Sequence, residues 1–218
     1  MNFKRLISFL QKLQKNNNKE WFDANRAEYE LLRKEWIDFV STLIKGIGAF
    51  DPAILVLEPK SCIFRINKDI RFSKDKTPYK TNFGASLNPG GKKSLLAGYY
   101  FHVSPKEVFL GGGTYMPMPE QLAAIRQEID YHYDEFLQIA ESKTVKKIFG
   151  AISGDELARP PKGYDLDNPA IGFLKKKSFL LIQNISVDSL SDKDFEKSLF
   201  QSAKAIKPLN DFINRAIS

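Results

Sequence analysis

The first fifty residues place apolar side chains at helical spacing. Five of them share one face of a helix: Phe3, Leu6, Ile7, Leu10 and Leu13. This spacing predicts a short amphipathic helix over residues 2–15, which the three asparagines at 16–18 interrupt. A longer helix is predicted over residues 19–45, because a wide apolar stripe that includes Trp36 and Phe39 runs along it and two glycines follow it. The same periodicity indicates that these aromatic residues belong to the core.

From Asp51 onward the pattern changes to short apolar runs divided by proline, glycine and asparagine. Four of these runs are predicted strands: residues 61–66, 81–87, 95–104 and 106–111. Turn-forming residues connect the later runs, and connections this short join antiparallel neighbours. The middle of the chain therefore predicts a mostly antiparallel sheet.

Helical and extended patterns alternate in the second half of the chain. The predicted elements are a helix that begins at Pro119, helical turns over 133–149, a surface loop over 150–169, a short helix from Asn168 to Leu174, a strand over 178–187 and a final helix after Ser191. Ser191 and Asp194 resemble a capping box, and Pro208 is expected to break or kink the final helix. Together the elements predict an α+β fold with a central, mostly antiparallel sheet, an N-terminal helical pair and C-terminal helices.

The composition indicates the size of the core and the cellular compartment of the protein. With 218 residues, 43% of them hydrophobic, the chain can bury a sizeable core. We expect a single domain over residues 1–218, helical over 1–50, mixed sheet and helix over 51–190, and ending in a helix over 191–218. The single Cys62 excludes an internal disulfide, and no apolar run approaches the roughly 20 residues of a membrane-spanning helix. We therefore expect a cytoplasmic protein without a membrane partner.

The positive charge is concentrated in one segment. The net charge is +7, and the stretch from Lys60 to Lys106 contains ten lysines and arginines against two aspartates, so the remainder of the chain carries −1. Two interpretations fit this concentration. It is typical of a surface that binds anions, and it is also typical of a solvated basic face that keeps strand edges from aggregating.

The densest part of this segment is residues 64–80, with six basic and two acidic side chains. Two faces are expected if residues 64–72 are extended: an apolar face of Phe64, Ile66, Ile70 and Phe72, and a polar face of Arg65, Asn67, Asp69 and Arg71. Two arginine forks on one face can clasp a phosphate or carboxylate group, with Asp69 to orient them or to accept a proton. Lys68 does not fit this alternation unless a bulge turns its side chain.

A polar loop follows, in which Asp75 lies between two lysines. Neighbouring cations keep a carboxylate ionised, which suits a structural tether or a metal contact better than a general acid. The alternative for the whole stretch is structural: Arg65, Asp69, Arg71 and Asp75 form an internal network of ion pairs that fixes the loop to the sheet.

The same residues resemble a family signature. Seven of them match the spacing Arg-x-x-Arg-Asp-x-Arg-Phe-x-x-(Asp/Asn)-Lys-x-x-Tyr: Arg65, Asp69, Arg71, Phe72, Asp75, Lys76 and Tyr79. This pattern is similar to that of a widespread bacterial family of conserved hypothetical proteins, domain of unknown function 2461. Lys68 departs from it, because the pattern has an arginine there. The resemblance extends over nearly the whole chain, through Trp21, Arg126 and residues 161–169, and it implies a family without implying a reaction.

Other candidates lie outside this stretch. The glycines at 111–113 are typical of a phosphate-binding loop or of a tight strand exit, and the absence of a following Lys-Ser/Thr favours the exit. His102 and His132 lack the spacing of zinc ligands, and His102 is either a candidate base or a structural residue on a strand. A secondary site is expected in the long loop, with the residues Lys162, Tyr164 and Asp165.

The leading hypothesis from the sequence is a basic pocket that binds a small molecule with a phosphate or carboxylate group, with catalysis as a candidate addition. Its expected anion-binding residues are Arg65, Lys68, Arg71, Lys76 and Tyr79. The candidate catalytic residues are Asp69, Asp75 and His102; no metal site is expected and no motif indicates a cofactor. The alternative is a module that binds nucleic acid or an acidic protein through the same segment. A concave pocket with inward arginines favours the first, and a flat stripe with outward lysines the second.

Overall fold

A four-stranded antiparallel sheet forms the centre of the computed structural model, which describes residues 1–218. The strands follow the order of the sequence across the sheet: β1 (Phe83–Leu87), β2 (Gly98–Val103), β3 (Val108–Thr114) and β4 (Phe179–Asn184). The register pairs Ala85 with Phe101 and Phe101 with Leu110. The antiparallel sheet and the α+β fold expected from the sequence are therefore confirmed.

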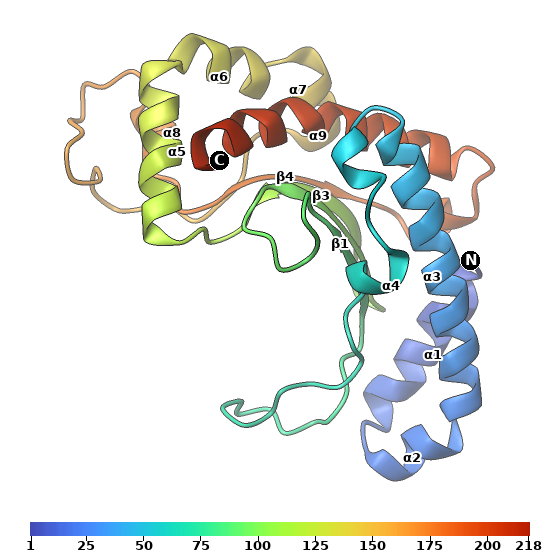
Figure 1. Cartoon of the computed structure of the whole chain (residues 1–218). Coiled ribbons are helices and arrows are strands. Elements are labelled where there is room, and N and C mark those ends of the chain that lie inside the picture. Colours follow the sequence, from blue (N-terminus) through green and yellow to red (C-terminus); the bar gives the residue numbers. More distant parts are fainter.

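The helices gather on the convex side of the curved sheet and at its ends, and a long hairpin lies on the concave side (Figure 1). The N-terminal helices are α1 (Phe3–Lys15), α2 (Lys19–Ala24), α3 (Arg26–Gly48) and the single turn α4 (Pro59–Cys62). The later helices are α5 (Pro119–Tyr131), α6 (Tyr133–Ala140), α7 (Lys143–Phe149), α8 (Ile171–Leu174) and α9 (Phe195–Ile217). Two 3₁₀ turns, η1 (Pro52–Ile54) and η2 (Asp188–Ser191), lie between them. No helix combines the length and the apolar character that crossing a membrane requires.

The core lies between the convex face of the sheet and the helices, and it contains 47 buried hydrophobic residues. Along β2, Tyr99 and Phe101 point into this core, whereas Tyr100 and His102 lie on the opposite, concave face. Trp36 of α3 stacks on Phe101 with ring centroids 6.0 Å apart, so the helical stripe that the sequence assigned to the core does lie there. The helices thus cover the convex face of the sheet (Figure 1), and the half-buried side chains of Tyr100 and His102 lie on the concave face.

Two predicted elements in the N-terminal half have different boundaries. The helix expected over residues 19–45 is divided into α2 and α3 at Asn25, whose side-chain amide donates to the Trp21 carbonyl at 2.8 Å and so ends α2. The strand expected over residues 61–66 is wrong. Pro59 begins a helical turn instead, and only Ile63 bridges to β1, opposite Ala85.

Three differences lie in the C-terminal half. The helical stretch over residues 133–149 divides at Ser142, whose hydroxyl accepts from the Val145 amide and caps α7. The glycines at 111–113 lie within β3 rather than at its exit, paired with both β2 and β4. The break expected at Pro208 is absent, because α9 continues to Ile217 with buried residues on both sides of the proline packed on the sheet.

Candidate functional site

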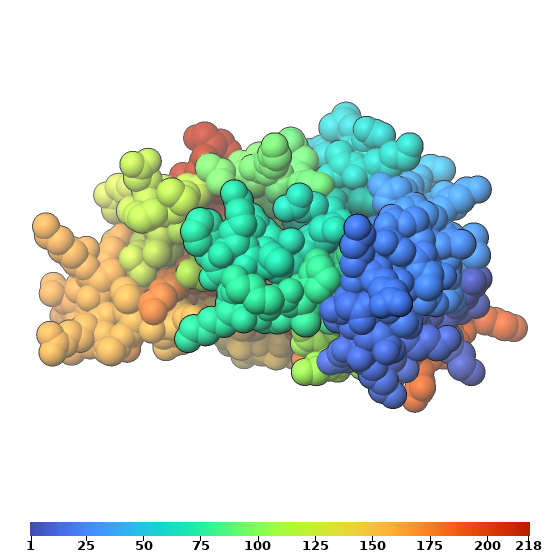
Figure 2. Space-filling view, turned by 90° about the horizontal axis from the view of Figure 1, so that it is seen from below, coloured from blue at the N-terminus to red at the C-terminus, as the bar shows by residue number.

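Residues 64–80 form a long hairpin that projects from the edge of β1 over the concave side of the sheet. Its two legs are joined by the backbone hydrogen bonds Lys68 N–H to Pro78 O, at 2.9 Å, and Lys80 N–H to Ile66 O, at 2.8 Å. Seen from below, the hairpin (teal) lies between the N-terminal helices (blue) and α5 (yellow-green) (Figure 2). The strand with two faces expected over residues 64–72 is wrong: Ile66 is buried, but Phe72 is 96% exposed. The far part of the hairpin has no neighbouring strand to cover it.

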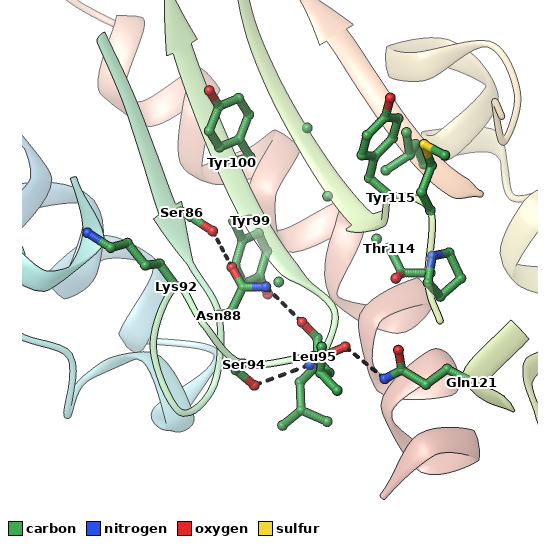
Figure 3. Close-up of a pocket in the computed structure, with 18 of the residues that line it drawn as sticks. Ser86, Asn88, Lys92, Ser94, Leu95, Tyr99, Tyr100, Thr114, Tyr115 and Gln121 are labelled. Carbon is green, nitrogen blue, oxygen red and sulfur yellow. Dashed lines mark hydrogen bonds between the residues drawn. The ribbon is translucent and has the colours of Figure 1, made fainter. Parts of the chain in front are cut away.

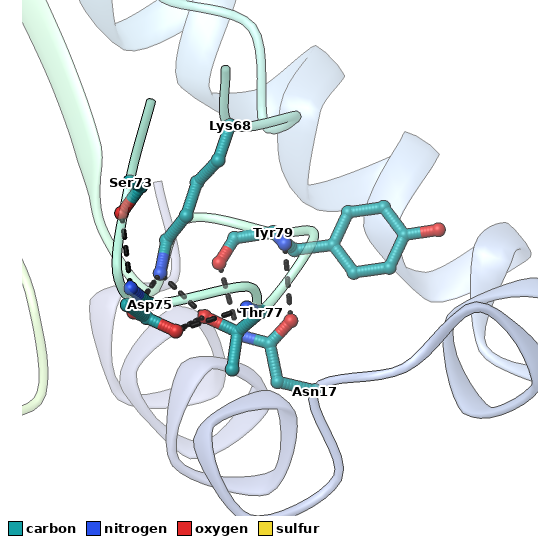
Figure 4. Close-up of polar contacts among 6 residues, drawn as sticks. All are labelled: Asn17, Lys68, Ser73, Asp75, Thr77 and Tyr79. Atoms are coloured by element: carbon teal, nitrogen blue, oxygen red, sulfur yellow. Dashed lines mark hydrogen bonds and ion pairs between the residues drawn. The ribbon is translucent and has the colours of Figure 1, made fainter. Parts of the chain in front are cut away.

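The base of the hairpin is fixed to the N-terminal helices by one side chain. Asn17, in the linker between α1 and α2, accepts from the Tyr79 amide at 3.0 Å and donates to the Tyr79 carbonyl at 2.9 Å. The Tyr79 ring is buried and stacks on Phe22 with centroids 4.0 Å apart. Figure 4 shows this ring directed away from the charged residues of the hairpin and towards the helices.

The tip of the hairpin, residues 68–77, is organised around Asp75 (Figure 4). The Lys68 ammonium donates to Asp75 Oδ2 at 2.7 Å and to Thr77 Oγ1 at 2.6 Å. The other carboxylate oxygen of Asp75 accepts from the amide and the hydroxyl of Thr77, at 2.9 and 2.8 Å. The hydrogen bond from Lys68, followed by those from Thr77, holds the pKa of Asp75 well below its ordinary value. Lys68, which did not fit the predicted alternation, is thus the partner of Asp75.

A second charged pair lies on the same tip. Arg71 donates to both carboxylate oxygens of Asp69, at 2.9 and 2.7 Å, and this pairing lowers the pKa of Asp69 and raises that of Arg71. The Lys76 ammonium donates to the Ile70 carbonyl at 3.0 Å. Five of the six charged groups of the tip are therefore engaged with one another or with the hairpin backbone, and Lys74 is the exception.

A basic recess of about 390 Å³ lies between the base of the hairpin and α3. We define the basic recess by its five cationic side chains: Arg26, Arg33, Lys60, Arg65 and Lys92. Glu30 is the single carboxylate among its 13 lining residues. The spacing of Arg26, Tyr29 and Arg33 places them on one face of α3. Tyr79 completes the wall from the hairpin side.

The cations of the recess are poorly neutralised. Arg26 pairs with Asp23, but Arg33, Lys60, Arg65 and Lys92 form no ion pair. At the edge of the recess, the pKa of Lys80 is lowered by burial and by the positive charges of Arg65 and Lys92. These like charges stand close enough to repel one another, and none of the three forms an ion pair with a carboxylate.

Two ammonium groups also meet at one aromatic ring. Lys80 and Lys92 lie 5.5 and 5.6 Å from the centre of the Phe64 ring, and Lys92 donates to the Ile63 carbonyl at 2.7 Å. Contacts with a ring face and a carbonyl hold these cations in place without cancelling their charge. The recess therefore presents a fixed positive potential.

The matching family covers nearly all of this structure. A family model described as Conserved hypothetical protein (DUF2461) matches residues 5–212. The chain belongs to the DUF2461 family. Comparisons with curated proteins and with solved structures give no match.

In this DUF2461 protein the signature residues divide between two places. Arg65 and Tyr79 line the basic recess, whereas the other five lie on the tip: Asp69, Arg71, Phe72, Asp75 and Lys76. Lys68, which departs from the signature, lies on the tip as well. The structure does not bring Arg65 and Arg71 together in one pocket. The recess adds Arg26 and Arg33, which the sequence reasoning missed. Their signal was the helical spacing of two arginines around Tyr29, on a helix considered only for its apolar stripe.

The remaining candidates lie elsewhere. His102 stacks on Phe109 with centroids 4.8 Å apart, and its Nδ1 is 3.3 Å from the Tyr100 hydroxyl; burial lowers its pKa. The secondary loop residues Lys162 and Tyr164 lie beside α5, at the end of the molecule opposite the N-terminal helices (Figures 1 and 2), and Asp165 follows them as an exposed residue. No group of three or more His, Cys, Asp or Glu side chains is arranged to hold a metal ion.

Proposed function

We propose that this DUF2461 protein binds a small molecule through a phosphate or carboxylate group held in the basic recess. The observation that carries the proposal is the charge of the recess: five cationic side chains and one carboxylate surround a concave space. Of the five cations, only Arg26 forms an ion pair. A structural network of ion pairs would place a carboxylate beside a cation, as the tip of the hairpin does for Lys68 and Arg71. An anion in the recess would relieve the repulsion among these cations.

The side chains around the recess suit separate tasks. Arg33 comes from α3 and Arg65 from the hairpin, so their guanidinium forks can approach an anion from two sides. Lys60 and Lys92 add charge, and the Tyr79 hydroxyl is a neutral donor whose ring the stack on Phe22 fixes. No residue of the tip lines this site, and the tip residues Lys68 and Arg71 are already paired with carboxylates.

The test uses pairs of matched arginine variants. Arg33→Gln and Arg65→Gln each remove a guanidinium from the recess, and we expect at least about a tenfold loss of affinity for pyrophosphate or citrate, since a hydrogen bond to a charged group contributes roughly 1.5–3 kcal/mol. Arg71→Gln removes the same group from the tip and should leave the affinity unchanged. Isothermal titration calorimetry at low salt measures all three. Equal affinities for the Arg65→Gln and Arg71→Gln proteins would contradict the proposal.

A random single-stranded oligonucleotide, titrated at rising salt, tests the alternative. Binding through an open basic surface should weaken about equally when either Arg65 or Arg71 is replaced, because both would contact phosphates, and it should fall steeply with salt. Oligonucleotide binding of that kind, without pyrophosphate or citrate binding, would replace the small-molecule proposal by the nucleic-acid one.

A further inference from the structure

A second and larger cavity, about 650 Å³, lies on the concave face of the sheet. We call it the glycine cleft, after the glycines of β3 that form its floor, Gly111 to Gly113. Its walls come from the loop that joins β1 to β2, with Leu95, and from the segment that follows β3, with Tyr115 and Met116 (Figure 3). Its volume falls within the range of roughly 300–1,000 Å³ that is usual for small-molecule sites.

The structural requirement for glycine differs among the three positions of the floor. A Cβ on Gly112 would lie 2.2 Å from Ile206 of α9, so packing of the core requires glycine there. Gly113 has a φ of +107°, and a Cβ on it would lie 2.0 Å from the Phe179 carbonyl oxygen. Both glycines are therefore explained by the fold.

Gly111 has no such reason. Its φ is not positive, and the nearest atom to an added Cβ would be the Leu181 carbonyl oxygen at 3.7 Å, an ordinary contact. On β3 the neighbouring Leu110 and Gly112 face the core, so a side chain at Gly111 would point into the cleft. The missing side chain enlarges the cleft without serving the fold, and strand propensity alone would favour a branched residue at this position.

The chemistry of the lining indicates the class of ligand. The floor is bordered by the apolar side chains of Tyr100, Phe109, Leu180 and Ile182, and no carboxylate or histidine lines the cleft. Its single cation is Lys92, whose ammonium Figure 3 shows directed away from the other lining residues; it is bound to the Ile63 carbonyl, on the side of the basic recess. A charged ligand would therefore find no counter-ion in the cleft.

The rim is apolar and its loops are held in place. Tyr115 is 74% exposed and Met116 65%, yet Met116 keeps a positive φ of 46° while its amide donates to Ser178 Oγ at 2.9 Å. The opposite loop is fixed by Asn88, which donates to the Leu96 carbonyl at 2.7 Å, and by Gln121, which donates to the Leu95 carbonyl at 3.4 Å. Large apolar side chains held at the mouth of a cavity are typical of a ligand site.

We propose that the glycine cleft binds an uncharged, ring-bearing small molecule that lies flat against the backbone at Gly111. Because Gly111 has no side chain, a planar ring can approach the sheet there more closely than a side chain would permit, and Tyr100 and Phe109 offer ring faces or edges beside it. This site is separate from the basic recess and does not depend on anion binding.

Indole and 2-naphthol are suitable probes, because both are neutral and planar at pH 7. Titration of either into the ¹³C-methyl-labelled protein should shift the methyl resonances of Leu180, Ile182 and Met116 along saturable curves. Gly111→Val places a branched side chain in the cleft and should weaken binding at least about tenfold, while Gly111→Ala gives a smaller loss. Gly172→Ala is the matched control, since an added Cβ there meets no atom within 4 Å and Gly172 does not line the cleft.

The outcomes separate the two proposed sites. Gly111→Val should keep the pyrophosphate affinity of the wild type, and Arg65→Gln should keep its indole affinity. The cleft proposal is overturned if neither probe shifts these methyl groups up to its solubility limit, or if Gly111→Ala and Gly111→Val, both confirmed as folded by their methyl spectra, bind the probes as tightly as the wild type does.

Discussion

At the two ends of the hairpin, the pKa values of the charged groups are shifted in opposite senses. At the tip, hydrogen bonds between partners lower the pKa values of Asp69 and Asp75 and raise that of Arg71, so each group is shifted towards its charged form. At the base, the pKa of Lys80 is lowered by burial and then by the charges of Arg65 and Lys92, so this group is shifted away from its charged form. The seventeen residues 64–80 thus contain charged groups that have an oppositely charged partner, and others whose nearest charged neighbours have the same sign.

The charged groups at the two ends of the hairpin therefore contribute differently to the folded protein. Paired charges on an exposed tip contribute little to the free energy of unfolding, but they fix the conformation of a segment that has no sheet neighbour. The repulsion between like charges at the base destabilises the folded protein slightly, and it is nevertheless present in this fold. Repulsion between neighbouring like charges is typical of sites that bind an oppositely charged ligand.

Removal of the Tyr79 ring should have the largest effect on the base. Tyr79→Ala deletes a buried ring stacked on Phe22, and we expect a loss of about 3 kcal/mol in the free energy of unfolding. Urea denaturation followed by circular dichroism measures it. Tyr79→Phe keeps the stack and removes only the hydroxyl, so it should leave stability nearly unchanged while weakening anion binding. A stable Tyr79→Ala protein would show that the base is not anchored by this contact.

The Asn17 anchor should have the next largest effect. Asn17→Ala removes two hydrogen bonds to the Tyr79 backbone, each contributing about 1 kcal/mol, for an expected loss of about 2 kcal/mol. Hydrogen exchange at the Tyr79 and Lys80 amides should accelerate, while the Leu110 amide, in the centre of the sheet, should keep its protection relative to global unfolding. Asn16→Ala, which removes only a side-chain contact to the Lys12 carbonyl, is the control. Unchanged exchange at both hairpin amides would contradict this assignment of the anchor.

The sequence predicted most of the fold because local pattern and tertiary packing agree there. Alternation placed three of the four strands expected in the middle of the chain, and helical spacing placed α1, α5 and the core side of α3. The failures have local causes. Pro59 outweighed the apolar run that followed it, and Asn25 divided a helix whose apolar stripe continues across the break.

The candidate site was only half visible in the sequence. Charge density pointed to residues 64–80, but alternation assumed a sheet neighbour that the far hairpin lacks, so it grouped Arg71 with Arg65. Arg26 and Arg33 lie more than thirty residues away, and only the packing of α3 against the hairpin base brings them to Arg65. Contacts between segments so distant in sequence leave no local pattern to detect. The glycine cleft was hidden for a related reason, because the orientation of Gly111 depends on the register of β3.

The smallest expected effect is a pH dependence at the base. The pKa of Lys80 in the folded protein lies below its ordinary value of 10.5. At pH values between the folded-state pKa and 10.5, the unfolded chain therefore binds more protons than the folded protein, and stability rises with pH across that window. The amino group is partly exposed, so the gain should stay well under ~1 kcal/mol. Lys80→Gln should lack the gain, whereas Lys68→Gln on the tip should retain it. Urea titrations from pH 8 to 10.5 compare the three proteins, and parallel curves for wild type and Lys80→Gln would show that the base carries no uncompensated charge at this position.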